Sequence, residues 1–296
     1  MIATVVAAGV STVQDGGRRG FSDVGVPVSG AWHRERYLLA VGLLTGNRDE
    51  SVPTIELLAG DCILDLHVET TMAVVGPARL WIDAAPGAVG ACVAVHGGQR
   101  IRVEHLGPGP VYLALSGWVP DRVLGSASRD TFSRIGPDLG TMLSGGVDGR
   151  AYAQVGAFHR EPTPSTGPVR VLLTGHPAGP DFVSGRWRVT AVARSGIRLA
   201  GSHLPGAGDI ASMPMLPGAI QVTPSGDPVI LGPDGGLTGG YPVVGVVATA
   251  DLDRLSLVVA DDVLAFGACD QREATRAYRE HAAALASAIA HPGLLA

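Results

Sequence analysis

Short runs of β-branched and other apolar residues, separated by glycine- and proline-rich turns, extend through almost the whole chain. Examples are Ile2–Val6, Thr71–Val75, Val169–Leu173 and Val243–Ala248, and the 296 residues include 42 glycines and 21 prolines. Runs of this length, bounded by turn residues, favour strands over helices. We therefore expect a mainly β protein with few helices, in which barrels are favoured over open sheets.

Only two segments have the pattern of a helix. Residues Trp32–Leu44 place apolar side chains at helical spacing and end at Gly46, which is a typical C-terminal signal. The second begins at the capping box Asp270-Gln-Arg-Glu273 and continues an apolar face towards His291. The first helix directly follows a polar loop, so its free N–H groups offer a place for an anion near Gly25–Gly30.

A proline-rich segment divides the chain. Three prolines and several small polar residues occur between Arg160 and Arg170, a composition typical of linkers. With about 150 residues per domain as a guide, we expect an N-terminal β domain over residues 1–163. A C-terminal β domain with the C-terminal helix would then cover residues 164–296.

All 22 basic residues are arginine, and this excludes several chemistries. Without lysine the chain has no Walker A loop, no Schiff base and no covalent biotin. The net charge of -5 and the scattered arginines argue against a nucleic acid partner. Three distant cysteines, no leader pattern and no long apolar run predict a cytoplasmic protein without a membrane segment. The histidines lack ligand spacing, so we predict no metal site.

Polar and glycine residues are concentrated between Ser11 and Gly30. The composition fits a binding loop, although a solvated loop without a ligand has a similar one. Further on, Arg194 and Arg198 are four residues apart around a glycine, as an anion clamp or as surface ion pairs. Gly125–Ser128 is either a turn or a hydroxyl-lined site, and Asp234–Pro242 is richer in glycine than an ordinary hairpin.

Taken together and in this order, these motifs resemble the allophanate hydrolase subunit 2 family, also known as the C-type subunit of 5-oxoprolinase or the biotin-dependent carboxyltransferase-like domain. The resemblance extends to about Asp270 and is carried by the segments Thr12–Asp15, Gly25–Gly30, Leu44–Asn47, Glu56, Gly125–Ser126, Arg194–Gly201, Gly218–Gln221 and Thr238–Pro242. It implies two cyclophilin-like β-barrel domains. It also implies a subunit 1 partner, similar to the B-type subunit of 5-oxoprolinase, and ATP-dependent opening of 5-oxoproline or a similar small amide, with ATP bound at the partner or at the shared interface.

Opening a lactam with ATP requires a carboxylate-binding group, carbonyl polarisation and stabilised phosphoryl charge. Catalytic roles accordingly fall to Asp15, Asp234 and Tyr241. Binding of substrate or anion falls to Gln14, Ser29, His33, Arg194, Arg198, Gln221, Thr238, Gly239 and Gly240. Two alternatives stay open: a non-catalytic regulatory subunit, and a carboxyltransferase that uses biotin on a separate carrier.

The chain departs from the family pattern at several positions. His33 stands where an acidic residue is usual, and Trp118, Ala127 and Leu237 also differ from the usual residues. We expect several of these positions to face the cleft. On that expectation the substitutions favour a subunit that has lost catalysis.

Overall fold

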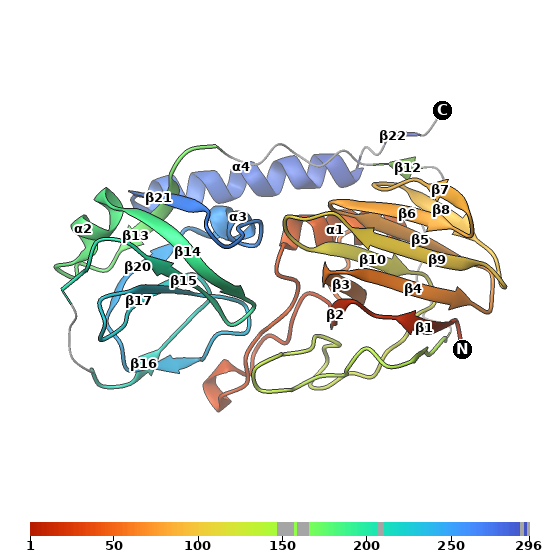
Figure 1. Ribbon diagram of the computed structural model, residues 1–296, viewed down its shortest axis with the longest axis horizontal. Coiled ribbons are helices and arrows are strands. Elements are labelled where there is room, and N and C mark those ends of the chain that lie inside the picture. Colours follow the sequence, from red (N-terminus) through yellow and green to blue (C-terminus); the bar gives the residue numbers. More distant parts are fainter. Residues whose placement is uncertain (147–156, 159–165, 206–209, 291–292, 295–296) are drawn as a thin grey trace.

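The computed structural model describes residues 1–146, 157–158, 166–205, 210–290 and 293–294. Figure 1 shows two β-rich halves side by side, with the long C-terminal helix running across both. The mainly β class with few helices is confirmed. The boundary expected after residue 163 falls outside the described residues.

The first half contains two antiparallel sheets. The six-stranded sheet has the order β11-β1-β4-β9-β6-β7, with β11 at Met142–Leu143, β1 at Ala3–Ala7, β4 at Asp61–Leu66, β9 at Arg100–His105, β6 at Ala78–Ile82 and β7 at Ala85–Gly87. The five-stranded sheet has the order β2-β3-β10-β5-β8, with β2 at Val10–Gln14, β3 at Thr54–Ala59, β10 at Val111–Leu115, β5 at Thr70–Val75 and β8 at Cys92–Val95.

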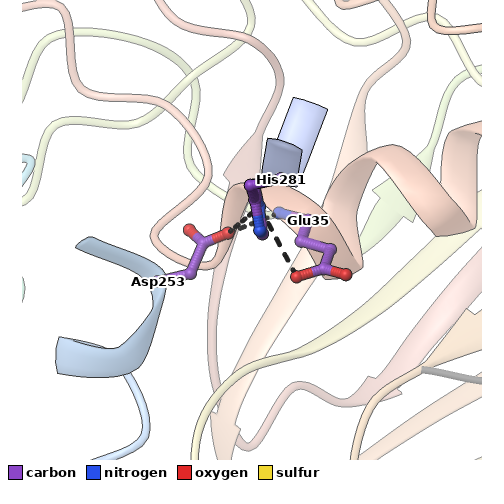
Figure 2. A group of neighbouring side chains, drawn as sticks. All are labelled: Glu35, Asp253 and His281. Carbon is purple, nitrogen blue, oxygen red and sulfur yellow. Dashed lines mark hydrogen bonds and ion pairs between the residues drawn. The ribbon is translucent and has the colours of Figure 1, made fainter. Parts of the chain in front are cut away.

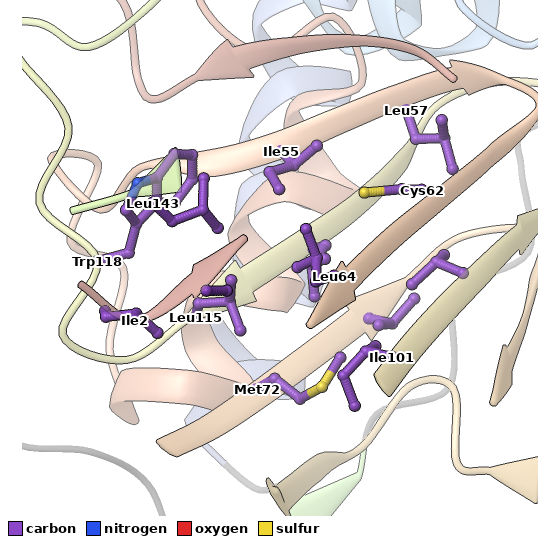
Figure 3. Packing of buried hydrophobic residues seen from close by; sticks show 14 of the residues in the cluster. Ile2, Ile55, Leu57, Cys62, Leu64, Met72, Ile101, Leu115, Trp118 and Leu143 are labelled. Atoms are coloured by element: carbon purple, nitrogen blue, oxygen red, sulfur yellow. The ribbon is translucent and has the colours of Figure 1, made fainter. Parts of the chain in front are cut away.

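One hydrophobic core lies between these sheets (Figure 3). Leu64 and Ile101 contribute from the six-stranded sheet, and Ile55 and Met72 contribute from the five-stranded sheet. Alternate residues of a strand point to opposite faces of the sheet. The inner strands of the five-stranded sheet are buried on both faces, because a hydrophobic cluster covers each face. In β10, Leu113 faces this core while its neighbours face a second cluster.

Helix α1 (Arg34–Thr45) covers the outer face of the five-stranded sheet. The sequence predicted this helix with one apolar face, but its residues from Glu35 to Thr45 are all buried. It is enclosed because the sheet covers one side and the C-terminal helix α4 (Gln271–Ala290) covers another. Before α1, the polar loop contains a single 3-10 turn, η1 (Ser22–Val24).

The second half is a closed barrel with the strand order β13-β20-β17-β18-β15-β14-β21. Its strands are β13 (Val169–Leu173), β20 (Val243–Val247), β17 (Ala219–Val222), β18 (Pro228–Leu231), β15 (Gly196–Ala200), β14 (Arg186–Ala193) and β21 (Val263–Ala268). Its core contains Trp187, which stacks on Phe182 of α2 (Gly179–Ser184) with ring centroids 5.3 Å apart.

The remaining elements are short. They are the pair β16 (Met213–Pro214) and β19 (Thr238–Gly239), the pair β12 (Ala157–Phe158) and β22 (Gly293–Leu294), the 3-10 turn η2 (Thr249–Asp251) and helix α3 (Leu252–Leu255). Within the described ranges, no helix combines the length and apolar character needed to cross a bilayer.

Helix α4 joins the two halves. The predicted cap is present, because Asp270 Oδ1 accepts a hydrogen bond of 2.8 Å from the Glu273 N–H. Further along, Leu285 and Ile289 are buried in the same cluster as α1 of the first half. A Cβ on Gly42 of α1 would come within 2.9 Å of the Ile289 side chain, so the helices approach closely here. A helix that follows the second half in sequence therefore completes the core of the first.

Candidate functional site

The guanidinium of Arg194 lies in the contact between the two halves, with only 2% of its side chain exposed. Arg194 lies in the turn between β14 and β15, and it donates to Asp234 of its own half and to Glu56 of the first half. It also donates to the Gly30 carbonyl at 2.8 Å and to Ser29 Oγ at 3.3 Å. We call Glu56, Arg194, Asp234 and Ser29 the seam network, because it connects both halves through buried charge.

Asp234 is fully engaged within this network. Its carboxylate accepts from Arg194 Nε and Nη2, both at 2.8 Å, from Ser29 Oγ at 2.5 Å, and from the N–H and hydroxyl of Thr131. Burial opposes the charge, but Arg194 and these hydrogen bonds hold the pKa of Asp234 below its usual value. An ionised carboxylate with all these donors is a structural anchor and a weak proton acceptor.

Glu56 is the member of the seam network to which the sequence assigned no role. It lies in the middle of β3, and its Oε2 accepts from the Trp32 N–H at 2.8 Å and from the Tyr112 hydroxyl at 2.6 Å. Burial and the nearby Glu56 charge raise the pKa of Tyr112, so this phenol stays protonated and donates. A charged residue inside an apolar strand could have indicated a buried ion pair from the sequence, because a buried charge requires a partner.

Asp15 organises the polar loop. Its two carboxylate oxygens accept from the Ser126 and Ser128 hydroxyls at 2.6 Å, from the Gly17 and Ala127 N–H groups at 2.9 and 2.7 Å, and from Arg122 at 3.2 Å. Gly125 lies in a tight turn closed by hydrogen bonds between Val123 and Ser126, as the turn interpretation predicted, and the hydroxyls of Ser126 and Ser128 follow it. Those hydroxyls are directed at Asp15, which is 2% exposed.

Gln14 Nε2 donates to the carbonyl of Arg129 at 2.8 Å, and Ser29 Oγ lies 3.2 Å from the same oxygen while its proton goes to Asp234. This carbonyl connects the neighbourhood of Asp15 to the seam network. The structure thus brings together five of the expected site residues: Gln14, Asp15, Ser29, Arg194 and Asp234. Each of them makes hydrogen bonds within the protein.

The start of α1 differs from the expectation of an anion site. Asp253 of α3 accepts from the Arg34 and Glu35 N–H groups at 2.7 and 2.9 Å, and the Nδ1 atom of His33 accepts from the Arg36 N–H at 3.4 Å. Burial lowers the pKa of His33 to about 4, against the opposing effect of Asp253, so the ring is a neutral acceptor at neutral pH. The groups expected to hold an external anion are occupied by side chains of this chain.

The predicted clamp of Arg194 and Arg198 is not formed. Arg194 is buried in the seam network, whereas Arg198 is exposed on β15 between the inward-facing Ile197 and Leu199. Successive residues of a strand point to opposite faces of the sheet, and the two neighbours of Arg198 face the barrel core. Arg198 therefore points out of the barrel and away from its core.

The last group of expected residues lies around β17 and β19. Gln221 is 8% exposed and donates to the Met215 sulfur at 3.6 Å. A Cβ on Gly239 would lie 2.3 Å from Gln221 Nε2, so Gly239 and the Gln221 side chain are in close contact. Thr238 is exposed, Gly240 is half-buried with its carbonyl accepting from Ile210, and Tyr241 is 37% exposed. This group is separate from the seam network.

A pocket with a volume near 130 Å³ lies between the polar loop and the second half. Its walls include Pro27 and Val28 from the first half, and Met215, Gly235, Gly236 and Leu237 from the second. The Met215 N–H donates to the Leu237 carbonyl at 2.8 Å, which connects this wall to the strands that carry Gln221 and Gly239. The volume exceeds the share of about 30 Å³ per liquid water several-fold, so the pocket has room for a small organic molecule.

Two of the departures from the family pattern do not face this pocket, contrary to expectation. Trp118 and Ala127 are 3% and 0% exposed and belong to the core of the first half. Leu237 does line the pocket, and His33 caps α1. The core can absorb apolar replacements by repacking, so Trp118 and Ala127 give no argument that catalysis has been lost.

A closed β-barrel, joined through a buried ionic seam to a second β-rich half with a pocket between them, defines a two-part β protein whose site is built from both parts. The chain belongs to the carboxyltransferase domain family, subdomains A and B, whose model matches residues 24–268. It is 29% identical to the C-type subunit of 5-oxoprolinase from Escherichia coli over 95% of each chain. It is also 29% identical to the protein of that name in Haemophilus influenzae over 92% of each chain.

A solved structure shares this fold over the full length of the chain. The K. lactis urea amidolyase superposes with a TM-score of 0.85 at 25% identity. The similar region covers 100% of this chain and 20% of that chain. The chain therefore corresponds to one fifth of a much larger enzyme.

Proposed function

We propose that this protein is the C-type subunit of a 5-oxoprolinase-like complex, which opens 5-oxoproline or a similar small amide with ATP. The observation that carries the proposal is the similarity to the C-type subunit of 5-oxoprolinase over 95% of both chains. The Escherichia coli relative is named as a subunit, and a subunit acts with partners. The partner that we propose for this chain is a subunit 1 protein of the B type.

The buried charged residues of this chain support a proposal in which substrate positioning and phosphate transfer belong to different subunits. Asp15, Asp234 and Arg194 are buried and hold one another or the neighbouring loops in place. Removing such a group from its partners to perform chemistry would expose a buried charge without compensation. We infer that this chain positions the substrate and that the groups which transfer phosphate, together with the ATP site, lie on the partner or at the shared interface.

The pocket lined by Pro27, Val28, Met215 and Gly235–Leu237 is the proposed position of the amide, and we call it the proposed amide pocket. It lies between loops of both halves, where a partner subunit can close over it. Tyr241 and Thr238 are the exposed polar groups of the neighbouring β17 and β19 region. They are the proposed contacts to substrate or to partner.

The test is reconstitution with the cognate partner subunits, followed by measurement of 5-oxoproline-dependent ADP and glutamate formation. The pocket variant is Gly236→Leu, because a Cβ there meets only the Thr238 carbonyl, at 3.4 Å, and the added side chain fills the pocket. The matched control is Gly140→Leu at an exposed glycine outside the pocket. We expect turnover in the native complex and in the control, and its loss in Gly236→Leu.

Absence of turnover above that of the separate subunits would refute the proposal. Full activity in Gly236→Leu would favour the alternative in which this chain is a regulatory subunit without a substrate site. That alternative has its own support, since the candidate catalytic residues Asp15 and Asp234 are saturated with hydrogen bonds.

Carboxyl transfer is the other alternative, and the family description together with the similarity to urea amidolyase favours it. The chain contains no lysine, so biotin would arrive on a separate carrier. Transfer of labelled carboxylate from a carboxylated carrier to a small amide, dependent on this protein, would establish it. Turnover of 5-oxoproline without any biotin carrier would rule it out.

A further inference from the structure

Three side chains capable of binding a metal ion converge beside α1. They are Glu35 from the first turn of α1, Asp253 from α3 and His281 from α4 (Figure 2). One donor atom from each lies within 4.8 Å of the others, and this is the single such group of three found in the described ranges. The three residues are far apart in sequence, which is why spacing rules predicted no metal site.

The separations within this group suit a shared ion better than direct hydrogen bonds. His281 Nε2 lies 3.6 Å from Glu35 Oε2 and 4.0 Å from Asp253 Oδ2, and both distances exceed a normal hydrogen bond. In a tetrahedral zinc site with bonds of about 2.1 Å, neighbouring donor atoms are about 3.4 Å apart. The His281–Glu35 separation is already close to this value, and the other donor atoms, all within 4.8 Å of one another, reach it by side-chain shifts of up to about 1.4 Å.

The surroundings support the three donors. Asp253 is fixed by the N–H groups of Arg34 and Glu35, so its carboxylate is oriented from outside the group, as is usual for metal ligands. Arg34, which also lines the pocket, forms an ion pair with Glu50. Two carboxylates facing one imidazole give the group negative charge, which a divalent cation neutralises.

The group also opens onto a cavity, which shares Pro217, Leu231 and Gly232 with the proposed amide pocket and reaches Ser29 of the seam network. Glu35, Asp253 and His281 line a pocket with a volume near 180 Å³, whose other walls include Ile197, Leu252, Leu255 and Leu285. The side chains are 12%, 15% and 34% exposed, so an ion can reach them from solvent. Three protein ligands and a free position are the pattern of zinc sites that bind an additional ligand.

We propose that Glu35, Asp253 and His281 bind one divalent transition-metal ion, with Zn²⁺ as the best fit, and that its fourth position faces the apolar pocket. The imidazole distinguishes this site from Mg²⁺ and Ca²⁺ sites, which prefer oxygen ligands. Because α1 belongs to the first half, while α3 lies between barrel strands β20 and β21 and α4 follows the barrel, the ion also connects the two halves. The fourth position is open to the carboxylate or carbonyl oxygen of a small molecule with an apolar body.

The test uses the full chain after treatment with a chelator. Calorimetric titration with Zn²⁺ should give one equivalent per chain, and Co²⁺ should give the absorption of a tetrahedral site. His281→Ala and Glu35→Gln should each weaken binding about 100-fold or more, since loss of even an outer-shell partner costs about 10–100-fold. Zn²⁺ should raise the thermal midpoint of the native chain but not of the variants.

The matched control is His96→Ala, which removes an exposed histidine 4.0 Å from a single carboxylate, that of Glu69. This control should bind Zn²⁺ as the native chain does. Absence of stoichiometric binding, or equal binding by the native chain, His281→Ala and Glu35→Gln, would overturn the proposal. Two separate ligand variants keep the test decisive if one of them does not fold, and neither residue belongs to the proposed amide pocket.

Discussion

Replacing Arg194 by methionine removes the only cation of the seam network. The side chain makes five hydrogen bonds, two to Asp234 and one each to Glu56, Ser29 and Gly30. Glu56 and Asp234 are 0% and 1% exposed, so Arg194→Met leaves two carboxylates buried without a cation. Removing one partner of a buried ion pair costs about 3–5 kcal/mol, and we expect a loss of that size in the free energy of unfolding.

The magnitude can be converted into a thermal shift. An unfolding entropy of about 2.1 cal/mol/K per residue gives about 0.6 kcal/mol/K for this chain, so the midpoint should fall by about 5–8 °C. Urea titration followed by circular dichroism and tryptophan fluorescence measures the free energy. Because Arg194 joins the two halves, the two probes should diverge in the variant if the halves begin to unfold separately.

The matched control is Arg188→Met. Arg188 pairs with Asp261 at 3.0 Å on the surface, where the two side chains are 54% and 82% exposed, so the change should stay within about 0.5 kcal/mol. A second comparison tests the cause, since adding Glu56→Gln to Arg194→Met removes one uncompensated charge and should recover part of the loss. A loss for Arg194→Met below about 1 kcal/mol, or equal to that of the control, would refute the account of the seam.

Two further predictions concern acid stability and the joining helix. Asp251 is buried and, although burial opposes its charge, Arg170 holds its pKa below the usual value. The ionised carboxylate therefore adds to the free energy of unfolding in full above the unfolded pKa of about 3.9, and this contribution is lost as pH falls through the folded pKa. The urea midpoint of Asp251→Asn should accordingly decline less than that of the native chain between about pH 5 and 2. Ile289→Ala should cost about 2–4 kcal/mol, because this side chain packs against α1. Val263→Ala at a 62% exposed position should change urea stability by less than about 0.5 kcal/mol, and equal losses for the two would contradict the packing of α4 on the first half.

The sequence was informative where structure is locally encoded. Short apolar runs between turns predicted a mainly β fold, and the capping box at Asp270 predicted the start of α4. It was also informative where motifs occur in a fixed order, since the family was identified from those segments and is confirmed. Strand alternation and capping depend on neighbours in the chain, and a single sequence contains those neighbours.

Contacts between distant segments were harder to predict. The charge and spacing of Arg194 and Arg198 indicated a clamp, but burial of one and exposure of the other separate them. The N-terminus of α1 was expected to be open, yet Asp253 from the other half occupies it. In both cases the deciding partner lies far away in sequence, and no local pattern specifies it.

By itself, the sequence determined the β-rich class, the absence of lysine chemistry and the family to which the chain belongs. Only the tertiary structure decided how the charged residues are used. It joined Arg194 to Glu56 across 138 positions of sequence and placed Glu35, Asp253 and His281 around one point. The physical reason is that the energy of a charged group depends on its burial and on the charges within a few ångströms, and both are set by how the two halves and α4 pack together.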